Sequence, residues 1–513
     1  MSTKIIDISD VKDRLSLKKT KVKIRSECEN TITFCTKEQE GITFFKFEKE
    51  LWKQLSYLGC HYTLLFLMSY HKRLDYSKWL NTSLYYAGKV PMEKTIKTVF
   101  GEVKYFRTYL VRKDSPGSGF YPLDTVSGLT RDGFSPSVIS LATRIATRVS
   151  FITSVNLFTY FYGWSPSTVS IETLVLGLGG KAGGYMEVAV APEGDSEVLI
   201  IEADGKATAT ATDEELAKRR IKRGKNKKGC CRRHRGKEKR KGKKRWRRKK
   251  GDKSKNGRSI TIVVMYTLKR GTDGLLHGPV NKIVQASYAP RRVILEWARR
   301  QATKRGFLPG SGKLIHIAID GEVCLKKGLA ELFPEATFAL DIRHVEEKLW
   351  KIGRAYYPEG SQELEDWVEE KRSLLYEGNV KELISQFKEM EKQLSKRAKR
   401  DKNKREILST VINYMEPRLD MMNYKDYIEE DLPIASGIVE GAARYVIGER
   451  MDCSGMRWIP IRAEAPLHLR CVELNGDWDR FFDWAYKDWR DKLEKEEKVL
   501  VRTNELIELL NAA

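Results

Sequence analysis

Two stretches of this sequence decide the fold: Val198-Leu199-Ile200-Ile201-Glu202-Ala203-Asp204-Gly205 and Leu314-Ile315-His316-Ile317-Ala318-Ile319-Asp320-Gly321. Each is an apolar run that predicts a buried strand, and each ends in an aspartate followed by glycine. A third segment, Pro433-Ile434-Ala435-Ser436-Gly437-Ile438-Val439-Glu440-Gly441-Ala442, predicts the start of a helix that carries Glu440. A single strand-end Asp-Gly is more often a turn than a metal ligand, so the inference depends on all three acids together. Two strand-end aspartates and a helical glutamate can hold a pair of Mg²⁺ ions, and such a pair serves phosphodiester chemistry.

The positive charge of the chain is concentrated in one segment. The 513 residues carry a formal net charge of +25, and Lys218–Arg258 contains 25 Lys and Arg against two acids, Glu238 and Asp252. That segment therefore carries +23 and leaves +2 for the rest of the chain. So polar a segment predicts a disordered loop between two strands that holds the phosphates of a polyanion non-specifically. The candidate DNA contacts in it are Arg232, Arg233, Arg235, Lys243, Lys244, Arg245, Arg247 and Arg248.

The composition predicts a folded protein of several domains. Hydrophobic residues make up 41 % of the chain, and its length predicts roughly two to four domains. Its eight cysteines form no CxxC pair, which argues against a disulfide framework or a structural zinc site. No signal-peptide pattern opens the chain, and the longest apolar stretches, such as Tyr62–Met68, are too short to span a membrane. We expect a cytoplasmic, nucleoid-associated protein without membrane contact.

We expect residues 1–195 to form a mostly helical DNA-binding region. Within residues 1–130, residues 95–111 alternate in polarity around Gly101-Glu102, which is typical of a β-hairpin. Residues 131–195 predict three short helices, and a helix followed by a glycine turn and a second helix is the geometry of a DNA-binding helix-turn-helix. Ordinary helical packing explains the same pattern. The helix starts are marked by Ser135-Pro136, Ser150 and Ser165-Pro166.

From residue 196 the pattern changes to strands. Their order, β-β-β-α-β-α-β, places the two aspartates on the first and fourth strands and matches the ribonuclease-H-like α/β fold. In that fold the first and fourth strands lie side by side, so the two carboxylates converge and need cations between them. We expect the core over residues 196–344, a helical insertion over 345–430 and the C-terminal core helices over 431–513. The predicted strands are 196–204, 259–267, 281–288, 314–320 and 336–341, with helices at 290–304 and 324–332.

Other polar residues near these strands are candidates for accessory roles. His344, in Asp341-Ile342-Arg343-His344, follows the fifth strand. It is a candidate for a phosphate contact or for proton transfer, and the alternative is a surface or core histidine without a role in the site. Glu202 alternates onto the same face as Asp204 and is a candidate satellite carboxylate. Glu322, just past Asp320, is an acid of the same kind that could be mistaken for the ligand. Asp204 and Asp320 are preferred as ligands because they are expected to end their strands.

Several segments resemble the ISKra-type family of bacterial insertion-sequence transposases of the DDE class. The Glu440 segment carries the resemblance, which continues through Arg450-Met451-Asp452-Cys453-Ser454-Gly455-Met456-Arg457-Trp458. Asp341-Ile342-Arg343-His344 is similar to the Asp-x-x-His signature that this family shares with Mutator-like transposases. The other similar segments are Phe120-Tyr121-Pro122-Leu123-Asp124, Ser127-Gly128-Leu129, Ala463-Glu464-Ala465, Leu469-Arg470 and Asn475-Gly476-Asp477-Trp478-Asp479.

The resemblance implies a prokaryotic enzyme that cleaves and joins DNA at the ends of a mobile element. Asp204, Asp320 and Glu440 would bind Mg²⁺, for which Mn²⁺ can substitute. The partners would be the double-stranded terminal repeats, the target DNA and further copies of the chain, in a homodimer or larger oligomer.

Two other functions stay open from the sequence. One is a ribonuclease-H-like nuclease or resolvase, and the other is a domesticated DNA-binding protein without catalysis. Arg457 and Trp458 follow the Glu440 helix as accessory candidates: Arg457 would grip a phosphate, and Trp458 would stack on an unpaired base. A core-anchoring role for Trp458 is the favoured alternative.

Overall fold

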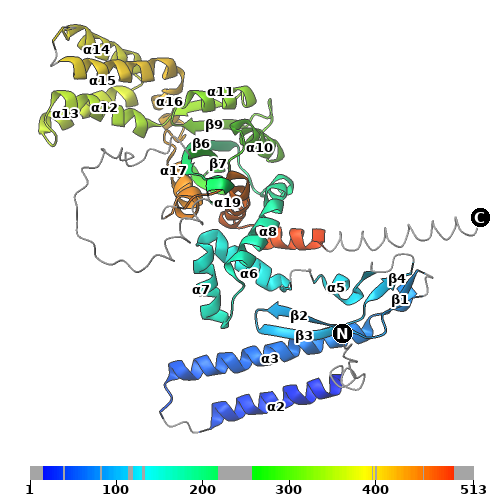
Figure 1. The fold of residues 1–513 in the computed structure, drawn as a ribbon. Coiled ribbons are helices and arrows are strands. Elements are labelled where there is room, and N and C mark those ends of the chain that lie inside the picture. The colour runs from blue at the N-terminus through cyan, green and yellow to red at the C-terminus, as the bar shows by residue number, and fades with distance from the viewer. Residues whose placement is uncertain are drawn as a thin grey trace, which may run out of the picture. The chain divides into compact units, whose positions relative to one another are not determined.

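A computed structural model describes residues 16–37, 41–80, 84–113, 119–129, 133–215, 217, 257–395, 397–398, 401–453 and 456–489. These form two compact units (Figure 1). The first comprises Met1–Leu178 with Trp478–Ala513, and the second comprises Gly179–Asp477. The division falls inside helix α8 (Thr168–Val188).

A five-stranded mixed sheet lies at the centre of the second unit (Figure 1). Its order is β10-β9-β6-β7-β8. The first three strands in sequence pair antiparallel, and β9 and β10 join the edge of β6 in parallel. The prediction that the first and fourth strands of this region are neighbours is confirmed by the β6–β9 pairing. The strands are β6 (Val198–Ala209), β7 (Gly257–Arg270), β8 (Leu276–Ser287), β9 (Leu314–Ile319) and β10 (Thr337–Leu340).

Helices pack against the sheet with their apolar faces. Helix α10 (Arg291–Lys304) buries Ile294, Leu295, Trp297 and Ala298. Leu199 and Ile201 of β6 belong to the same core cluster as these side chains. Helices α11 (Val323–Leu332) and α12 (Ile342–Tyr356) add Leu325, Leu329, Val345 and Leu349 to that cluster. A continuous core therefore fixes the strands that carry the predicted acids.

The region between α12 and the Glu440 segment is helical, and it shares this core. Val380, Leu383, Ile384 and Phe387 lie on one face of α14 and are buried in the cluster, and Met390 and Leu394 pack against it. Because these side chains pack in one cluster with those of the sheet, the helices are anchored to the strands. The elements are α13 (Gln362–Tyr376), α14 (Val380–Gln393), α15 (Lys402–Met415), η2 (Glu416–Met421) and α16 (Tyr424–Glu429).

The C-terminal part of the chain differs from the predicted run of helices. The Glu440 segment forms α17 (Gly437–Ala442), the π-helical turn η3 (Ala443–Gly448) and α18 (Glu449–Met451). The chain then leaves the helix, and Trp458 bridges to Thr210 before α19 (Pro460–Leu474) begins. The helix described from residue 478 to 489 falls in the first unit instead of the second. There the Trp478 indole donates to Ser140 Oγ at 3.0 Å.

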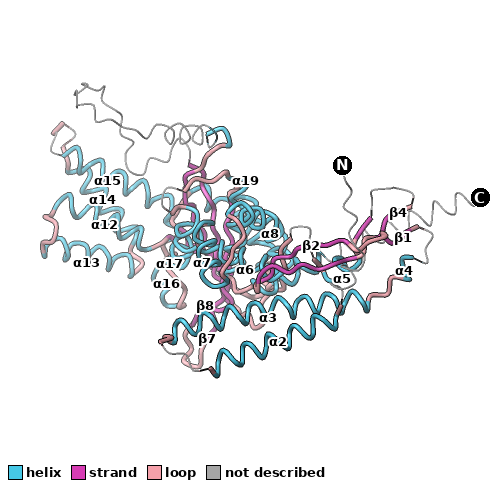
Figure 2. The backbone as a smooth tube through the Cα atoms, turned by 60° about the horizontal axis from the view of Figure 1, so that its bottom comes forward, coloured by secondary structure: helices cyan, strands magenta, loops and turns pink. Residues whose placement is uncertain are grey.

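The first unit contains a long helical pair and a hairpin (Figure 2). Helices α2 (Leu17–Thr36) and α3 (Phe44–Arg73) precede the hairpin of β2 (Met92–Thr98) and β3 (Gly101–Arg107). The predicted hairpin is present, but its turn is Val99-Phe100, because Thr98 pairs with Gly101. Its second strand is also shorter than expected, since Leu110–Arg112 forms β4 of another sheet. That sheet has the order β1-β4-β5, with β1 at Tyr85–Ala87 and β5 at Gly119–Phe120, and α4 (Ser77–Leu80) precedes it.

The three helices expected between residues 131 and 195 are present, following α5 (Pro122–Ser127). Ser135 and Ser150 cap α6 (Pro136–Arg148) and α7 (Phe151–Tyr162), and Gly163 in the left-handed region ends α7. The third helix, α8, is longer than the short helix expected. In the described part of the chain, no helix is long and apolar enough to cross a membrane. The described cysteines, Cys28, Cys35, Cys60, Cys324, Cys453 and Cys471, are all free thiols.

Candidate active site

Asp204 and Asp320 lie next to each other at one end of the β6–β9 pairing. The last registered pair is Ala203 with Ile319, so the two aspartates are the next residues on neighbouring parallel strands. Registered residues of parallel strands place their side chains on the same face, with strands about 4.8 Å apart. Burial raises the pKa of Asp204, and the charge of Asp320 raises it further. Two like charges held this close favour a cation between them.

One expectation about Asp204 is wrong. Asp204 does not end its strand, because β6 continues to Ala209 in pairing with β7. It lies instead at the point where β6 loses β9 as a neighbour, and it is half-buried there. The register of β6 and β9 therefore brings the two aspartates together, although Asp204 lies inside its strand.

The turn after Asp320 is held from the helical region. Gly321 has φ +82°, and a Cβ there would meet the side chains of Leu340 and Arg418 at 2.6 and 2.7 Å. The Tyr414 hydroxyl donates to the Asp320 carbonyl at 2.9 Å, and Arg418 Nε donates to the Gly321 carbonyl at 2.8 Å. Glycine is required here by both conformation and space.

Buried polar groups hold the segment that leads to Glu440. His316 of β9 lies 2.9 Å from the Pro433 carbonyl through Nε2 and 2.8 Å from Thr337 Oγ1 through Nδ1. A carbonyl only accepts, so Nε2 carries the proton. Burial lowers the pKa of His316 to about 4, which keeps the ring neutral. The Ile342 amide then donates to the Ile434 carbonyl at 2.9 Å.

Asp341 and Glu202 fix the first turn of α17. The carboxylate of Asp341 accepts from the Ser436 amide at 2.8 Å and from the Ser436 hydroxyl, and its other oxygen accepts from the Arg343 amide at 2.8 Å. Glu202, only 1 % exposed, accepts from the Val439 amide at 2.7 Å and from the Tyr266 hydroxyl at 2.8 Å. Burial raises the pKa of Glu202 to about 7. Glu202 is thus a buried anchor for the α17 helix, a role that alternation along the strand alone did not indicate.

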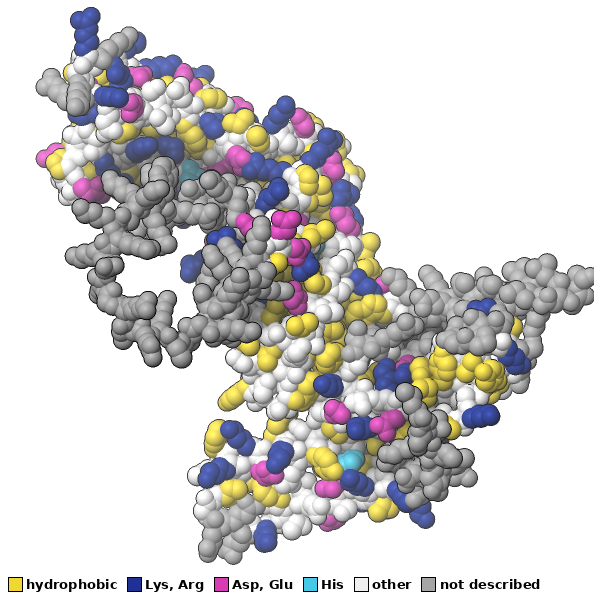
Figure 3. Space-filling view, in the orientation of Figure 1, with side chains coloured by type: hydrophobic (Ala, Val, Ile, Leu, Met, Phe, Trp, Pro, Cys, Tyr) yellow, Lys and Arg dark blue, Asp and Glu magenta, His cyan; other side chains and the backbone are white. Residues whose placement is uncertain are grey.

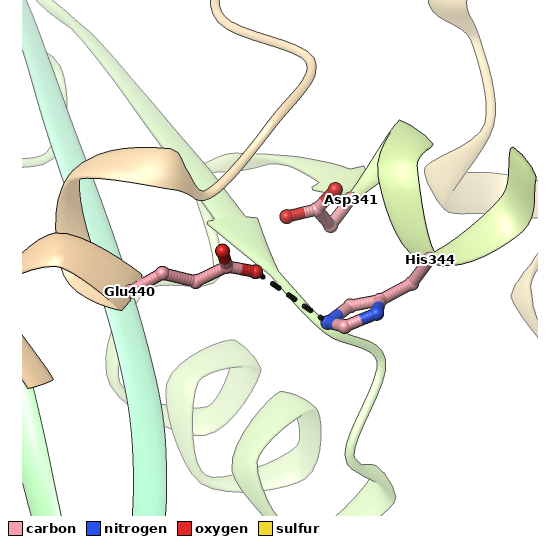
Figure 4. Close-up of side chains that lie close together, drawn as sticks. All are labelled: Asp341, His344 and Glu440. Atoms are coloured by element: carbon pink, nitrogen blue, oxygen red, sulfur yellow. Dashed lines mark ion pairs between the residues drawn. The ribbon is translucent and has the colours of Figure 1, made fainter. Parts of the chain in front are cut away.

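Glu440 extends from α17 toward His344 of α12 (Figure 4). His344 Nε2 lies 3.8 Å from Glu440 Oε1, and the two side chains are 33 % and 44 % exposed. One ligand atom from each of Asp341, His344 and Glu440 lies within 4.8 Å of the others, so this group could hold a metal ion. His344 also lowers the pKa of Asp204, so it is a shared neighbour of Asp204 and Glu440.

The donor chemistry of this region fits a hard divalent cation. Carboxylate oxygens are the ligands that Mg²⁺ prefers in proteins. Both Asp341 oxygens accept hydrogen bonds, while Asp204 and Asp320 each accept one through Oδ1, from the Gly205 amide at 2.6 Å and the Glu322 amide at 2.9 Å. Among the described residues, Asp341, His344 and Glu440 form the group whose ligand atoms are close enough to share an ion, and Asp204 and Asp320 lie outside it.

Glu322 and Arg291 form an ion pair at the edge of this site. Glu322 contributes to the raised pKa of Asp204, so its charge is felt at the pair of aspartates. A Cβ on Gly205 would meet both side chains, Arg291 Nη2 at 3.3 Å and Glu322 Oε2 at 3.6 Å. Arg291 follows Pro290 at a helix start, and no sequence signal marked it.

Arg457 and Trp458 lie away from Asp204, just beyond the C-terminal end of β6. Trp458 bridges to Thr210, six residues beyond Asp204, which corresponds to about 20 Å along an extended strand. Its ring packs on the guanidinium of Arg450, at 4.8 Å, and Arg450 is 1 % exposed. Arg457 is half-buried, and it makes no hydrogen bond or ion pair with another described residue. The contacts of Trp458 are those of a packing residue.

The candidate DNA contacts of the basic run, from Arg232 to Arg248, lie outside the described residues. No known protein-family model and no curated protein sequence matches this chain.

Proposed function

We propose that this chain is a DDE transposase that cleaves and joins DNA at the ends of an insertion sequence. The observation that carries the proposal is the register of β6 and β9, which places Asp204 beside Asp320. The sheet order supports a ribonuclease-H-like core, because three antiparallel strands are followed by two that join the first in parallel.

The site residues divide into ligands and anchors. Asp204 and Asp320 would bind cations between them, and Glu440 would complete the ligand set from α17. Bound Mg²⁺ would supply activation of the attacking oxygen and stabilisation of the leaving oxygen at phosphorus. Glu202 and Asp341 hold the first turn of α17, so Glu440 is positioned before substrate arrives.

His344 is suited to a proton or a phosphate at this site. It lies beside Glu440 at 3.8 Å and remains one-third exposed, so a substrate oxygen can approach the ring. A neutral imidazole accepts a proton and a charged one donates to a phosphate oxygen. The Lys218–Arg258 run would hold DNA phosphates without regard to sequence.

The experiment is cleavage of a plasmid that carries the DNA flanking the gene for this chain. Nicking or double-strand cleavage at the element ends should require Mg²⁺, and Asp204→Asn, Asp320→Asn and Glu440→Gln should each abolish it. Asp273→Asn is the matched control, because Asp273 is an exposed acid of the same unit that pairs only with its own loop and His277.

Other outcomes would assign another function. Cleavage of branched DNA without preference for the element ends would indicate a resolvase. Specific binding of the ends, with no metal-dependent cleavage by the wild-type chain, would indicate a non-catalytic DNA-binding protein. Equal loss in the Asp273→Asn control would contradict the assignment of the site.

A further inference from the structure

The first unit contains a wide cleft lined by aromatic side chains. Its volume is about 1170 Å³, and its walls come from the first half of α3, the hairpin turn and the end of α7. Phe45, Trp52 and Tyr57 of α3 are 61, 52 and 47 % exposed. Phe100 of the turn is 45 % exposed, and Tyr160 and Phe161 of α7 are 75 and 57 % exposed. So many exposed aromatic rings around one hollow indicate a binding surface.

Contacts within this aromatic cleft orient the rings of Trp52, Tyr160 and Phe161, which stay exposed. The Trp52 indole N–H donates to the Phe161 carbonyl at 2.9 Å, which satisfies its polar atom and fixes its orientation. Tyr160 and Phe161 pack edge to face, with ring centroids 5.4 Å apart. A fixed and exposed aromatic face binds another flat ring with little loss of conformational freedom.

The region around the cleft is basic, and Lys49 and Lys53 line the cleft itself. Residues 16–113 contain 19 Lys and Arg against nine Asp and Glu, a net charge of +10. Lys23 lies over the Tyr57 ring at 5.6 Å, and Lys49 lies over the Phe45 ring at 4.5 Å. Two acids, Glu48 and Glu102, also line the cleft. Figure 3 shows hydrophobic side chains and Lys and Arg side chains intermixed over α2 and α3, at the bottom of the view.

We propose that this aromatic cleft binds an unpaired stretch of nucleic acid, with bases stacked on Trp52, Tyr160 and Phe161. Flat rings beside cations are the combination that binds single strands, since every base has a face to stack and every nucleotide has a phosphate. An apolar peptide would use the rings but not the excess of cations. The site goes beyond the proposed reaction, because it lies wholly in the first unit and involves no carboxylate of the second.

The test measures binding of the full chain to labelled oligonucleotides by fluorescence anisotropy, in EDTA so that cleavage does not interfere. Single-stranded DNA, single-stranded RNA and duplex DNA of equal length are compared. Because we expect the Lys218–Arg258 run to hold the phosphates of single strands and duplex alike, the readout is the preference for single strands over duplex. This readout does not depend on the proposed transposase activity.

Tyr160→Ser and Trp52→Leu should each weaken single-strand binding by roughly 5- to 150-fold, the loss of one stacked base. Duplex binding should stay unchanged. Lys23→Gln and Lys49→Gln should each lower the salt slope of single-strand binding by roughly 0.7, the effect of one phosphate contact. Tyr445→Ser is the matched control, because Tyr445 is 53 % exposed in the second unit.

Two results would overturn the proposal. One is an unchanged single-strand preference in Tyr160→Ser, which removes an exposed ring and leaves the fold intact by circular dichroism. The other is self-association of wild-type chains in sedimentation that Tyr160→Ser abolishes, together with equal oligonucleotide affinity of the two proteins in the anisotropy assay. That result would mean that the cleft binds a second copy of the chain. A preference for single-stranded RNA over single-stranded DNA, or the reverse, would support the proposal and identify which nucleic acid the cleft binds.

Discussion

Removing the acceptor at Glu202 should loosen Glu440 without touching a metal ligand. Glu202→Leu leaves two buried donors without a partner, the Val439 amide at 2.7 Å and the Tyr266 hydroxyl at 2.8 Å in the wild-type chain. Each unsatisfied buried donor costs about 1–3 kcal/mol, so the unfolding free energy should fall by roughly 2–6 kcal/mol. Glu202→Gln should restore most of this loss, since its amide oxygen can accept from Val439 and its NH₂ can donate to the Tyr266 oxygen.

The assay has two readouts on the same three proteins. Thermal unfolding by circular dichroism should give a melting temperature at least about 4 °C lower for Glu202→Leu than for wild type. Magnesium titration of plasmid cleavage should show a higher midpoint for Glu202→Leu, because α17 no longer holds Glu440 in place, and a near-normal midpoint for Glu202→Gln. Equal damage in the two variants would refute the reasoning, since it would show that the charge of Glu202 matters and not its acceptors.

Four further predictions concern other parts of the chain. Burial lowers the pKa of His316 to about 4, so the unfolded chain binds the proton more readily than the folded chain. Urea titrations should therefore show that about 3 kcal/mol of stability is lost as pH falls from about 6.5 to 4, and this loss should be absent in His316→Asn. Asp195→Ala should lower the unfolding free energy by about 3–5 kcal/mol, because Arg305, 1 % exposed, loses its bidentate partner at 2.7 Å; adding Arg305→Met should recover most of it. Deletion of residues 222–255 should weaken binding to every DNA duplex and flatten its salt dependence in filter-binding assays, while sequence preference survives. Trp458→Ala should lower the melting temperature by an amount equivalent to roughly 3–5 kcal/mol, and a near-normal melting temperature with lost cleavage would instead indicate base stacking.

Local patterns were enough to predict the elements of the core. The apolar runs ending at Asp204 and Asp320 indicated strands because a buried parallel strand needs apolar side chains on both faces. The serine caps at Ser135 and Ser150 were recognisable because a capping hydroxyl satisfies the first free amides of a helix. The neighbouring positions of the first and fourth strands were expected because the order of elements matched the ribonuclease-H-like fold.

Contacts between residues far apart in the sequence decided the rest of the site. Glu202 was ambiguous along its strand, because alternation gives a face and not a partner, and its partner Val439 is 237 residues away. The hairpin turn is at Val99-Phe100 and not at Gly101-Glu102, because the pairing register of the two strands sets the turn. The alternation of polar and apolar residues did not specify that register.

The sequence by itself determined which acids are present, which strands carry two of them and where the charge of the chain is concentrated. Only the tertiary structure decided that β9 ends at Ile319 while β6 runs on, with the half-buried Asp204 beside Asp320. It also decided that Asp341 and Glu202 are anchors of α17, since each accepts hydrogen bonds from that segment. The physical reason is that a carboxylate's role depends on the donors around it, and long-range packing brings those donors together.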